Sequence, residues 1–156
     1  MKDNAVKFVI VGDGPEKDSL LRLAAARNLK NVLFQPNIEK TKIPSLIKAC
    51  NAYIVPLKKL DLFKGAIPSK LFEPLALKRP ILLGVDGEAR QLFIEEGKAG
   101  LYFEPENADE LADLIKQLVA NPSLAATLGD QGQLYVKDNF DRERIHGNFL
   151  LHLENR

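Results

Sequence analysis

The stretch "LFKGAIPSKLFEPLALKRPILLG", residues 62–84, joins a polar loop to a short helix and then to an apolar strand. Pro68 suits the first turn of a helix, because the missing N–H of proline would be unpaired there in any case. Pro74 lies inside the same segment and biases Glu73 away from the helical region. We therefore predict a helix with a bent or loosened first turn, followed by a buried strand over residues 80–85.

Strands and helices alternate on both sides of this stretch. Short apolar runs predict strands at residues 7–12, 31–35, 52–57, 80–85 and 100–104. The continuous apolar run at 7–12, which ends in glycine, is typical of a strand buried on both faces. Apolar residues at helical spacing fill the intervals at 15–29, 43–50, 88–97 and 107–121, and residues 123–156 form a C-terminal helical tail. The alternation predicts an α/β fold, a Rossmann-like doubly wound parallel sheet, in a single domain over residues 1–156.

Bulk properties exclude several classes of protein. The chain has 156 residues and a net charge of +1, so its overall charge favours neither nucleic acid nor a membrane surface. No apolar run approaches the roughly 20 residues of a transmembrane helix. The single cysteine favours a reducing compartment, and the spacing of the two histidines does not suit a metal site. We expect a cytoplasmic protein without a metal, a nucleic-acid partner or a transmembrane segment.

A glycine turn follows the first predicted strand in "VGDGPEKD". Gly12 and Gly14 match a dinucleotide-binding turn, but Lys17 replaces its third glycine and Gln35 stands near the place of the expected acid. The pattern therefore disfavours an NAD-type site. Two interpretations stay open, namely a tight turn that needs glycine for its backbone conformation and a turn that lines a phosphate site.

The start of the predicted central helix combines groups that suit an anion. Small residues precede a helix start, where backbone N–H groups are free, and a hydroxyl and an ammonium group follow. These candidate diphosphate ligands are Gly65, Ala66, Ile67, Pro68, Ser69 and Lys70. Glu73 lies one turn further on, where its carboxylate can accept hydrogen bonds from the hydroxyl groups of a ribose. The alternative is a solvated pair between Lys70 and Glu73, and the residues alone leave both interpretations open.

Five segments in order resemble one enzyme family. They are "FVIVGDGP" (8–15), "NVLFQPNIEKTKIPSLIKACNAYIVPL" (31–57), "IPSKLFEPLALKRPILLG" (67–84), "EEGKAGLYFEPENADELADLIKQLVANP" (95–122) and "FDRERIHGNFLLHL" (140–153). Together they resemble the C-terminal, donor-binding half of GT-B fold glycosyltransferases of family 4. Members of this family are retaining enzymes that use nucleotide sugars.

The resemblance implies roles for the candidate residues. Glu73 would bind the donor ribose, residues 65–70 the diphosphate, and the loop with Pro36 and Asn37 the base, with Gly12 and Gly14 in a turn near the site. It implies no cofactor besides the sugar donor, and it assigns no catalytic residue to this chain. Many members carry another glutamate eight residues before the ribose-binding one. Gly65 stands there, as in a subset with a "PSKLFE"-like segment that includes bacterial O-antigen and capsule transferases.

The resemblance also bears on the extent of the chain. In the family this domain begins with a further strand and a long helix, which supply an arginine and a lysine for the diphosphate, and an N-terminal domain holds the acceptor. We therefore expect a donor-binding fragment, truncated at its N-terminal βα unit and inactive alone. The parent enzyme would transfer a sugar from a UDP-sugar to a glycan or lipid-linked acceptor, with peripheral contact at the inner face of the membrane.

Three other classes of protein share parts of this sequence pattern. A sugar-nucleotide 2-epimerase shares the overall fold, but the "PSKLFE" segment argues against it. A dinucleotide oxidoreductase is disfavoured by Lys17 and Gln35. A non-enzymatic Rossmann-like or flavodoxin-like receiver module needs an acid pair after its first strand and an aspartate after its third, whereas Asp13 stands alone and residues 56–58 are Pro-Leu-Lys.

Overall fold

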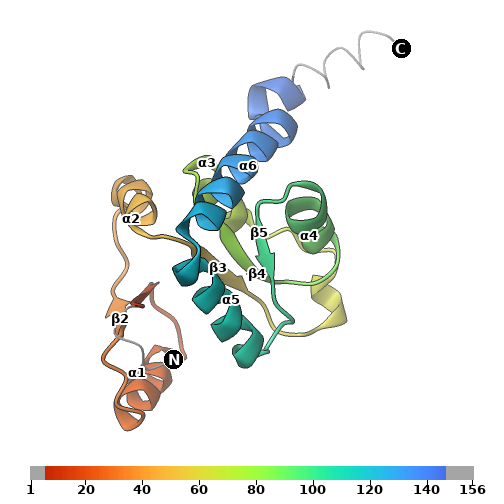
Figure 1. Ribbon diagram of the computed structural model, residues 1–156. Helices are drawn as coiled ribbons and strands as arrows, with labels where there is room; N and C mark the ends of the chain where they lie inside the picture. Colours follow the sequence, from red (N-terminus) through yellow and green to blue (C-terminus); the bar gives the residue numbers. More distant parts are fainter. Residues whose placement is uncertain (1–5, 147–156) are drawn as a thin grey trace, which may run out of the picture. The chain divides into compact units, whose positions relative to one another are not determined.

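The computed structural model describes residues 6–146, which divide into two units between Ile43 and Pro44 (Figure 1). The first unit contains β1 (Phe8–Val11), α1 (Lys17–Ala26), β2 (Val32–Gln35) and η1 (Lys40–Lys42). β1 and β2 run parallel and are joined by a connection that contains α1, with Phe8 opposite Val32 and Val11 opposite Gln35.

The second unit carries the remaining elements around a three-stranded parallel sheet in the order β3-β4-β5. The elements are α2 (Ile43–Ala49), β3 (Tyr53–Pro56), η2 (Asp61–Phe63), η3 (Ser69–Leu71), α3 (Phe72–Ala76), β4 (Ile81–Gly84), α4 (Glu88–Arg90), η4 (Gln91–Glu96), β5 (Gly100–Tyr102), α5 (Ala108–Ala120) and α6 (Pro122–Phe140). Figure 1 shows α6 running alongside α3 over this sheet.

The core of the second unit lies around β4. All four residues of this strand are buried, because β3 and β5 pair with both of its edges and helices cover its faces. Phe93 of η4 is fully buried and its ring contacts those of Phe72, Tyr135 and Phe140. Burial of one such side chain contributes about 1.5–3 kcal/mol, so these contacts fix α3 and α6 on the sheet.

The first strand differs from its prediction. We expected residues 7–12 to be buried on both faces, but Val9, Ile10 and Val11 are 38%, 44% and 36% exposed. Within residues 6–146, β1 is hydrogen-bonded to β2 alone, so one edge and much of its surface lack the neighbours that β4 has. An apolar run therefore predicted the strand correctly and its burial wrongly.

The loosened start of the central helix is confirmed. Pro68 precedes a single 3₁₀ turn, η3, and the regular helix α3 begins only at Phe72. Pro74 thereby falls in the first turn of α3, where its missing N–H costs little. The two closely spaced prolines therefore explain why the start of this helix is short and irregular.

The helices after β4 show one confirmation and one difference. Asn107, with Glu110 three residues later, has the sequence pattern that predicts a helix N-cap. The structure confirms it, because the side-chain oxygen of Asn107 accepts the backbone N–H of Glu110 at 3.1 Å at the start of α5. The predicted helix over residues 88–97 is instead one α-helical turn, α4, followed by the π-helix η4. Of the predicted tail, α6 and residues 142–146 are helical, and residues 147–156 lie outside the described part.

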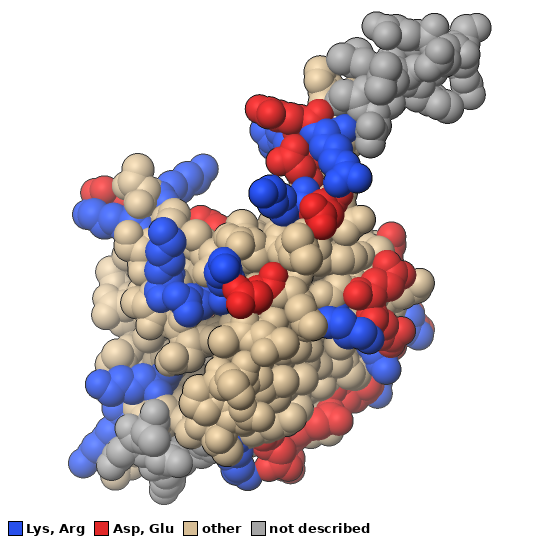
Figure 2. Space-filling model, turned by 45° about the horizontal axis from the view of Figure 1, so that its top comes forward, with Lys and Arg blue, Asp and Glu red and all other residues tan. Residues whose placement is uncertain are grey.

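The predicted α/β class with Rossmann-like parallel strands is thus confirmed. Hydrogen bonds join the described strands into two sheets, one in each unit, where we expected one continuous sheet. The single domain over residues 1–156 stays a prediction. No described helix combines the length and the apolarity needed to cross a membrane. Figure 2 shows acidic and basic side chains mixed on the segment that leads to the C-terminal residues.

Candidate functional site

The segment after η2 presents the polar residues that the sequence singled out. Leu71 and Leu75 are fully buried against the sheet, which anchors η3 and α3 from one side. Ser69, Lys70 and Glu73 are exposed. The two leucines therefore hold one face of this short helical segment in the core and leave the other face, with a hydroxyl, an ammonium group and a carboxylate, to solvent.

Backbone donors are free at the start of this segment. The N–H of Ala66 donates to Phe63 and that of Leu71 donates to Pro68, both at 3.0 Å. Among the described residues, the N–H groups of Ser69 and Lys70 donate no hydrogen bond. Two adjacent N–H groups beside a hydroxyl and an ammonium group can bind an anion.

The alternative of a solvated pair between Lys70 and Glu73 gains no support. Within residues 6–146, no ion pair or hydrogen bond links the two side chains. Both groups are therefore available to a ligand, which is the arrangement that binding of a diphosphate and a ribose requires.

Gly65 is not required by the backbone. Its φ angle lies outside the left-handed region, and an added Cβ would meet no atom within 4 Å. A side chain at this position, including the glutamate of many family members, would therefore have room.

Tyr53 is a neighbour of Glu73 that the sequence did not reveal. Burial raises the pKa of the Tyr53 hydroxyl above its ordinary value, and the charges of Glu73 and Cys50 raise it further. The residue opens β3, and α3 follows only after a long loop. No spacing rule connects positions 53 and 73, so only the folded chain shows that they are close.

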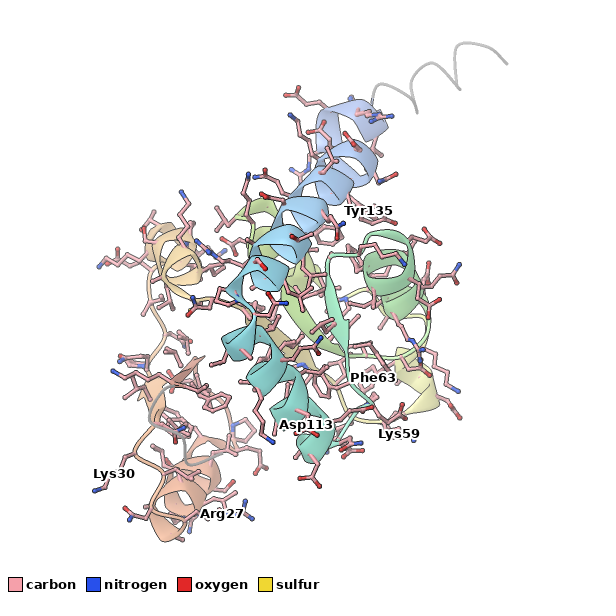
Figure 3. All side chains as sticks on the ribbon, viewed as in Figure 1. Arg27, Lys30, Lys59, Phe63, Asp113 and Tyr135 are labelled. Carbon is pink, nitrogen blue, oxygen red and sulfur yellow. The ribbon has the colours of Figure 1, made fainter. Side chains whose placement is uncertain are left out.

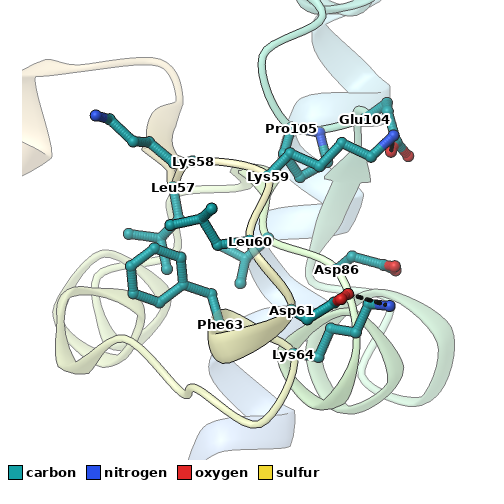
Figure 4. A pocket seen from close by; sticks show the side chains of 11 residues that line it. Leu57, Lys58, Lys59, Leu60, Asp61, Phe63, Lys64, Asp86, Glu104 and Pro105 are labelled. Carbon is teal, nitrogen blue, oxygen red and sulfur yellow. Dashed lines mark ion pairs between the residues drawn. The ribbon is translucent and has the colours of Figure 1, made fainter.

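A pocket of about 560 Å³ lies beyond the carboxyl ends of the three strands (Figure 4). Leu57 follows β3, Asp86 follows β4 and Glu104 follows β5, and the loop from Leu57 to Lys64 supplies most of the remaining wall. Figure 3 shows Lys59 and Phe63 at this end of the sheet. Ligands of open parallel sheets bind at such edges. The sequence alone predicts a ligand near residues 57–68, because this loop follows a predicted strand of a parallel sheet. It does not single out Glu104 or Pro105.

Charged side chains form a network along the pocket. The ammonium group of Lys59 pairs with Glu104 at 2.7 Å, and the Tyr102 hydroxyl donates to the same carboxylate at 2.7 Å. The hydrogen bond from Lys59 lowers the pKa of Glu104, and that from Tyr102 lowers it further. Burial, followed by the hydrogen bond to Glu104, raises the pKa of Tyr102 to about 12. The guanidinium of Arg90 lies over the Tyr102 ring, 4.1 Å from its centre.

In the first unit, the glycine turn and the predicted base loop are neighbours. Gly12 has a φ angle of 136°, which few other residues adopt, and its N–H donates to Gln35 at 3.1 Å. A hydrogen bond from the side chain of Lys17 lowers the pKa of Asp13, to which the backbone of Asn37 also hydrogen-bonds. Lys17 thus has a role in the turn, and Asp13 is a contact that sequence reasoning missed.

The other predicted residues of this unit are less constrained. An added Cβ at Gly14 would meet nothing within 4 Å, so that glycine is not needed for packing. Pro36 lies in the loop between β2 and η1. The requirement for glycine at Gly12 supports the tight-turn interpretation at that position, and a role in phosphate binding stays a prediction.

Comparison with known sequences identifies relatives. Residues 1–135 match the family described as "Glycosyl transferases group 1". Among curated proteins, the poly(ribitol-phosphate) alpha-N-acetylglucosaminyltransferase of Staphylococcus aureus is 30% identical over 157 residues, an alignment that covers 96% of this chain and 29% of the relative.

Comparison with solved structures agrees. A S. aureus TarM mutant in complex with fondaparinux, alpha-GlcNAc-glycerol and UDP is 28% identical with a TM-score of 0.78, over 96% of this chain and 29% of that one. Anabaena HepE in complex with UDP-glucose has a TM-score of 0.81 at 22% identity, over 99% of this chain and 42% of that one, which shows the fold alone. The chain thus spans less than half of these proteins.

Proposed function

Because the chain belongs to the group 1 glycosyl transferases, we propose that it is the part of a glycosyltransferase that binds the nucleotide-sugar donor. The family match over residues 1–135 is the observation that carries this proposal. The free polar groups between Gly65 and Glu73 support it, since they suit a diphosphate followed by a ribose. The chain spans 29% of the S. aureus relative, so we assign the acceptor site to polypeptide outside this sequence.

The proposed roles follow the chemistry of each group. The N–H groups of Ser69 and Lys70, with the hydroxyl of Ser69 and the ammonium group of Lys70, bind the diphosphate. They stabilise the negative charge that develops on it as the sugar leaves. The Glu73 carboxylate accepts hydrogen bonds from the ribose hydroxyls. The nucleotide sugar is a substrate, and the proposal includes no resident cofactor or metal.

The finer assignments are parts of the same proposal. We assign the chain to the retaining family 4 enzymes, to the subset with a "PSKLFE"-like donor helix, and to UDP-linked donors. The TarM structure contains UDP, which supports the choice of nucleotide. A glycan or lipid-linked acceptor at the cytoplasmic face of a membrane completes the proposal. Gly12, Gly14, Pro36 and Asn37 are assigned to the nucleotide. The titration below tests Gly12, Gly14 and Asn37 through their own amide signals, and Pro36, which has no amide proton, through the signals of its neighbours in the loop.

A titration of the ¹⁵N-labelled chain with UDP, followed by amide NMR, tests the proposal. We expect UDP to shift the amide signals of Ser69, Lys70 and Glu73 with a dissociation constant of about 1 mM. NAD at the same concentration should leave them in place. Parallel titrations with GDP and ADP test the choice of uridine.

A matched pair of variants makes the test specific. Glu73→Ala should weaken UDP binding about tenfold, because a charge-assisted hydrogen bond is lost. Glu143→Ala removes another exposed glutamate, which has no ion pair in the described part of the chain, and should bind UDP as the unchanged chain does. The proposal fails if saturating UDP moves no signal in residues 65–73, or if both variants bind equally well.

A further inference from the structure

The loop from Leu57 to Lys64 leads directly into the candidate diphosphate segment. It is built of consecutive turns, in which the N–H of Phe63 donates to Leu60 at 2.9 Å and that of Lys64 donates to Asp61 at 3.1 Å. An ion pair between Lys64 and Asp61 at 2.8 Å joins the same turn (Figure 4). The conformation of this loop therefore determines the position of Gly65, the first residue of the candidate diphosphate segment.

The first end of the loop is tied to the residues after β5. The ammonium group of Lys59 pairs with Glu104 at 2.7 Å, and the backbone N–H of Lys59 donates to the carboxylate of Glu106 at 3.2 Å. One lysine is thus held through both its side chain and its backbone.

The acid that holds Lys59 is itself fixed from several sides. Glu104 accepts the hydroxyl of Tyr102 at 2.7 Å, and its backbone N–H donates to the carboxylate of Glu110 at 2.6 Å. Glu110 belongs to the capped first turn of α5. The turn after β5 therefore offers Lys59 a rigid acceptor.

The second end of the loop is tied to the turn after β4. The backbone N–H of Glu88 donates to the carbonyl oxygen of Lys64 at 2.7 Å. Gly87 has a φ angle of 85°, and an added Cβ there would overlap the carbonyl oxygen of Lys64 and lie 2.7 Å from its Cα. Glycine is therefore required at position 87 both by its backbone angle and by the approach of Lys64.

We propose that Glu104 and Gly87 are positioning residues, which hold the loop 57–64 against the ends of β5 and β4. They thereby present residues 65–70 to the nucleotide in one conformation. We call these two attachments of the loop 57–64, through Glu104 and through Gly87, the clamp. The clamp consists of contacts within this chain, and only its effect on nucleotide binding rests on the proposed function. The loop is a fixed wall in this arrangement, so binding does not require it to close.

Hydrogen exchange of single amides tests the clamp without any ligand. The N–H of Glu88 bonds to Lys64 and the N–H of Ala66 bonds to Phe63, so both report on the loop. Glu104→Gln should speed their exchange about fivefold, because it removes the ion pair with Lys59, and should leave Leu82 and Leu83 in β4 unchanged. Asp113→Asn is the matched control, since it also removes a lysine–acid pair of 2.7 Å, with Lys116.

Measurement of UDP affinity tests whether the clamp contributes to nucleotide binding. Glu104→Gln should weaken UDP binding about threefold to fivefold, and Asp113→Asn should not change it. Lys59→Gln should have the same effect as Glu104→Gln, and the double variant should be no worse than either single one. Gly87→Ala should give a larger loss of both protection and affinity.

The outcomes separate the two proposals. If the loop amides exchange equally fast in Glu104→Gln and Asp113→Asn, the clamp is overturned. If Glu104→Gln loosens the loop and leaves a measurable UDP affinity unchanged, the positioning role is overturned. If the unchanged chain binds no UDP, the proposed function fails, and the exchange comparison still decides whether Glu104 and Lys59 hold the loop.

Discussion

Gly129 of α6 lies directly against the backbone of Lys78, at the turn that follows α3. An added Cβ at Gly129 would overlap the carbonyl oxygen of Lys78 and lie 2.9 Å from its carbonyl carbon. Lys78 has a φ angle of 59°, a left-handed conformation that is uncommon for a residue other than glycine. The contact brings α6 onto the helical segment that presents Glu73.

Gly129→Ala should therefore destabilise the second unit by about 1–3 kcal/mol, because backbone atoms must separate to admit the methyl group. Urea unfolding followed by tyrosine fluorescence measures this, since Tyr53, Tyr102 and Tyr135 all belong to this unit. Gly65→Ala is the matched control and should change stability by less than about 0.5 kcal/mol. Equal stability of the two variants would contradict the close contact.

Gly65→Glu should fold as the unchanged chain does. The position is open and its backbone angle suits any residue, so we expect a change of less than about 0.5 kcal/mol in unfolding free energy. Amide spectra of β4 should overlay with those of the unchanged chain. Gly87→Glu provides the contrast, because it places a side chain where the Lys64 backbone lies. Loss of the folded spectrum in Gly65→Glu would show that this position is constrained.

The role of Glu73 predicts a preference for ribose over deoxyribose. If its carboxylate accepts a hydrogen bond from the 2′-hydroxyl, UDP should bind about tenfold more tightly than 2′-deoxy-UDP. In Glu73→Ala the two nucleotides should bind equally, since the acceptor is gone. NMR titrations of both proteins with both nucleotides give the four affinities. An unchanged ratio in Glu73→Ala would assign the ribose to another residue.

The pair of Lys59 and Glu104 predicts a contribution to stability that depends on pH. The hydrogen bond from Lys59 lowers the pKa of Glu104 below its ordinary value of 4.5. A lowered carboxyl pKa stabilises the fold above the unfolded value, and this contribution disappears as the pH falls through the folded one. The difference in unfolding free energy between the unchanged chain and Glu104→Gln should be constant above pH 5 and shrink towards pH 3.

Urea unfolding of both proteins at pH 3, 4, 5 and 7 measures that difference, and the other carboxylates cancel in the comparison. The contribution should be small, because the side chains of Lys59 and Glu104 are 65% and 39% exposed. A difference that grows as the pH falls would contradict the sign of the shift.

Features that depend on neighbours within a few residues could be predicted from the sequence. The loosened turn between Pro68 and Pro74 and the cap from Asn107 to Glu110 both follow from local rules. Local rules also explain why the predicted strand boundaries agree with the observed ones to within a residue or two.

Features that depend on distant contacts could not be predicted. Lys59 and Glu104 are far apart in the sequence, and nothing in either local pattern indicates their ion pair. The proximity of Tyr53 to Glu73 has the same origin. The prediction that β1 is buried was wrong for a related reason. An apolar run predicts a strand, whereas the number of neighbouring strands decides whether that strand is covered.

The edge of β1 that is unpaired in the described part of the chain has a consequence for behaviour at high concentration. Among residues 6–146, one edge of β1 has no hydrogen-bonded strand beside it, and the valine and isoleucine side chains of β1 are exposed. Such an edge is a template onto which a strand of another molecule can add. Solubility should therefore depend more on Val9 and Val11 than on the acidic and basic side chains elsewhere on the surface. Lysine at either position, placed as a gatekeeper, should raise the concentration at which the protein precipitates.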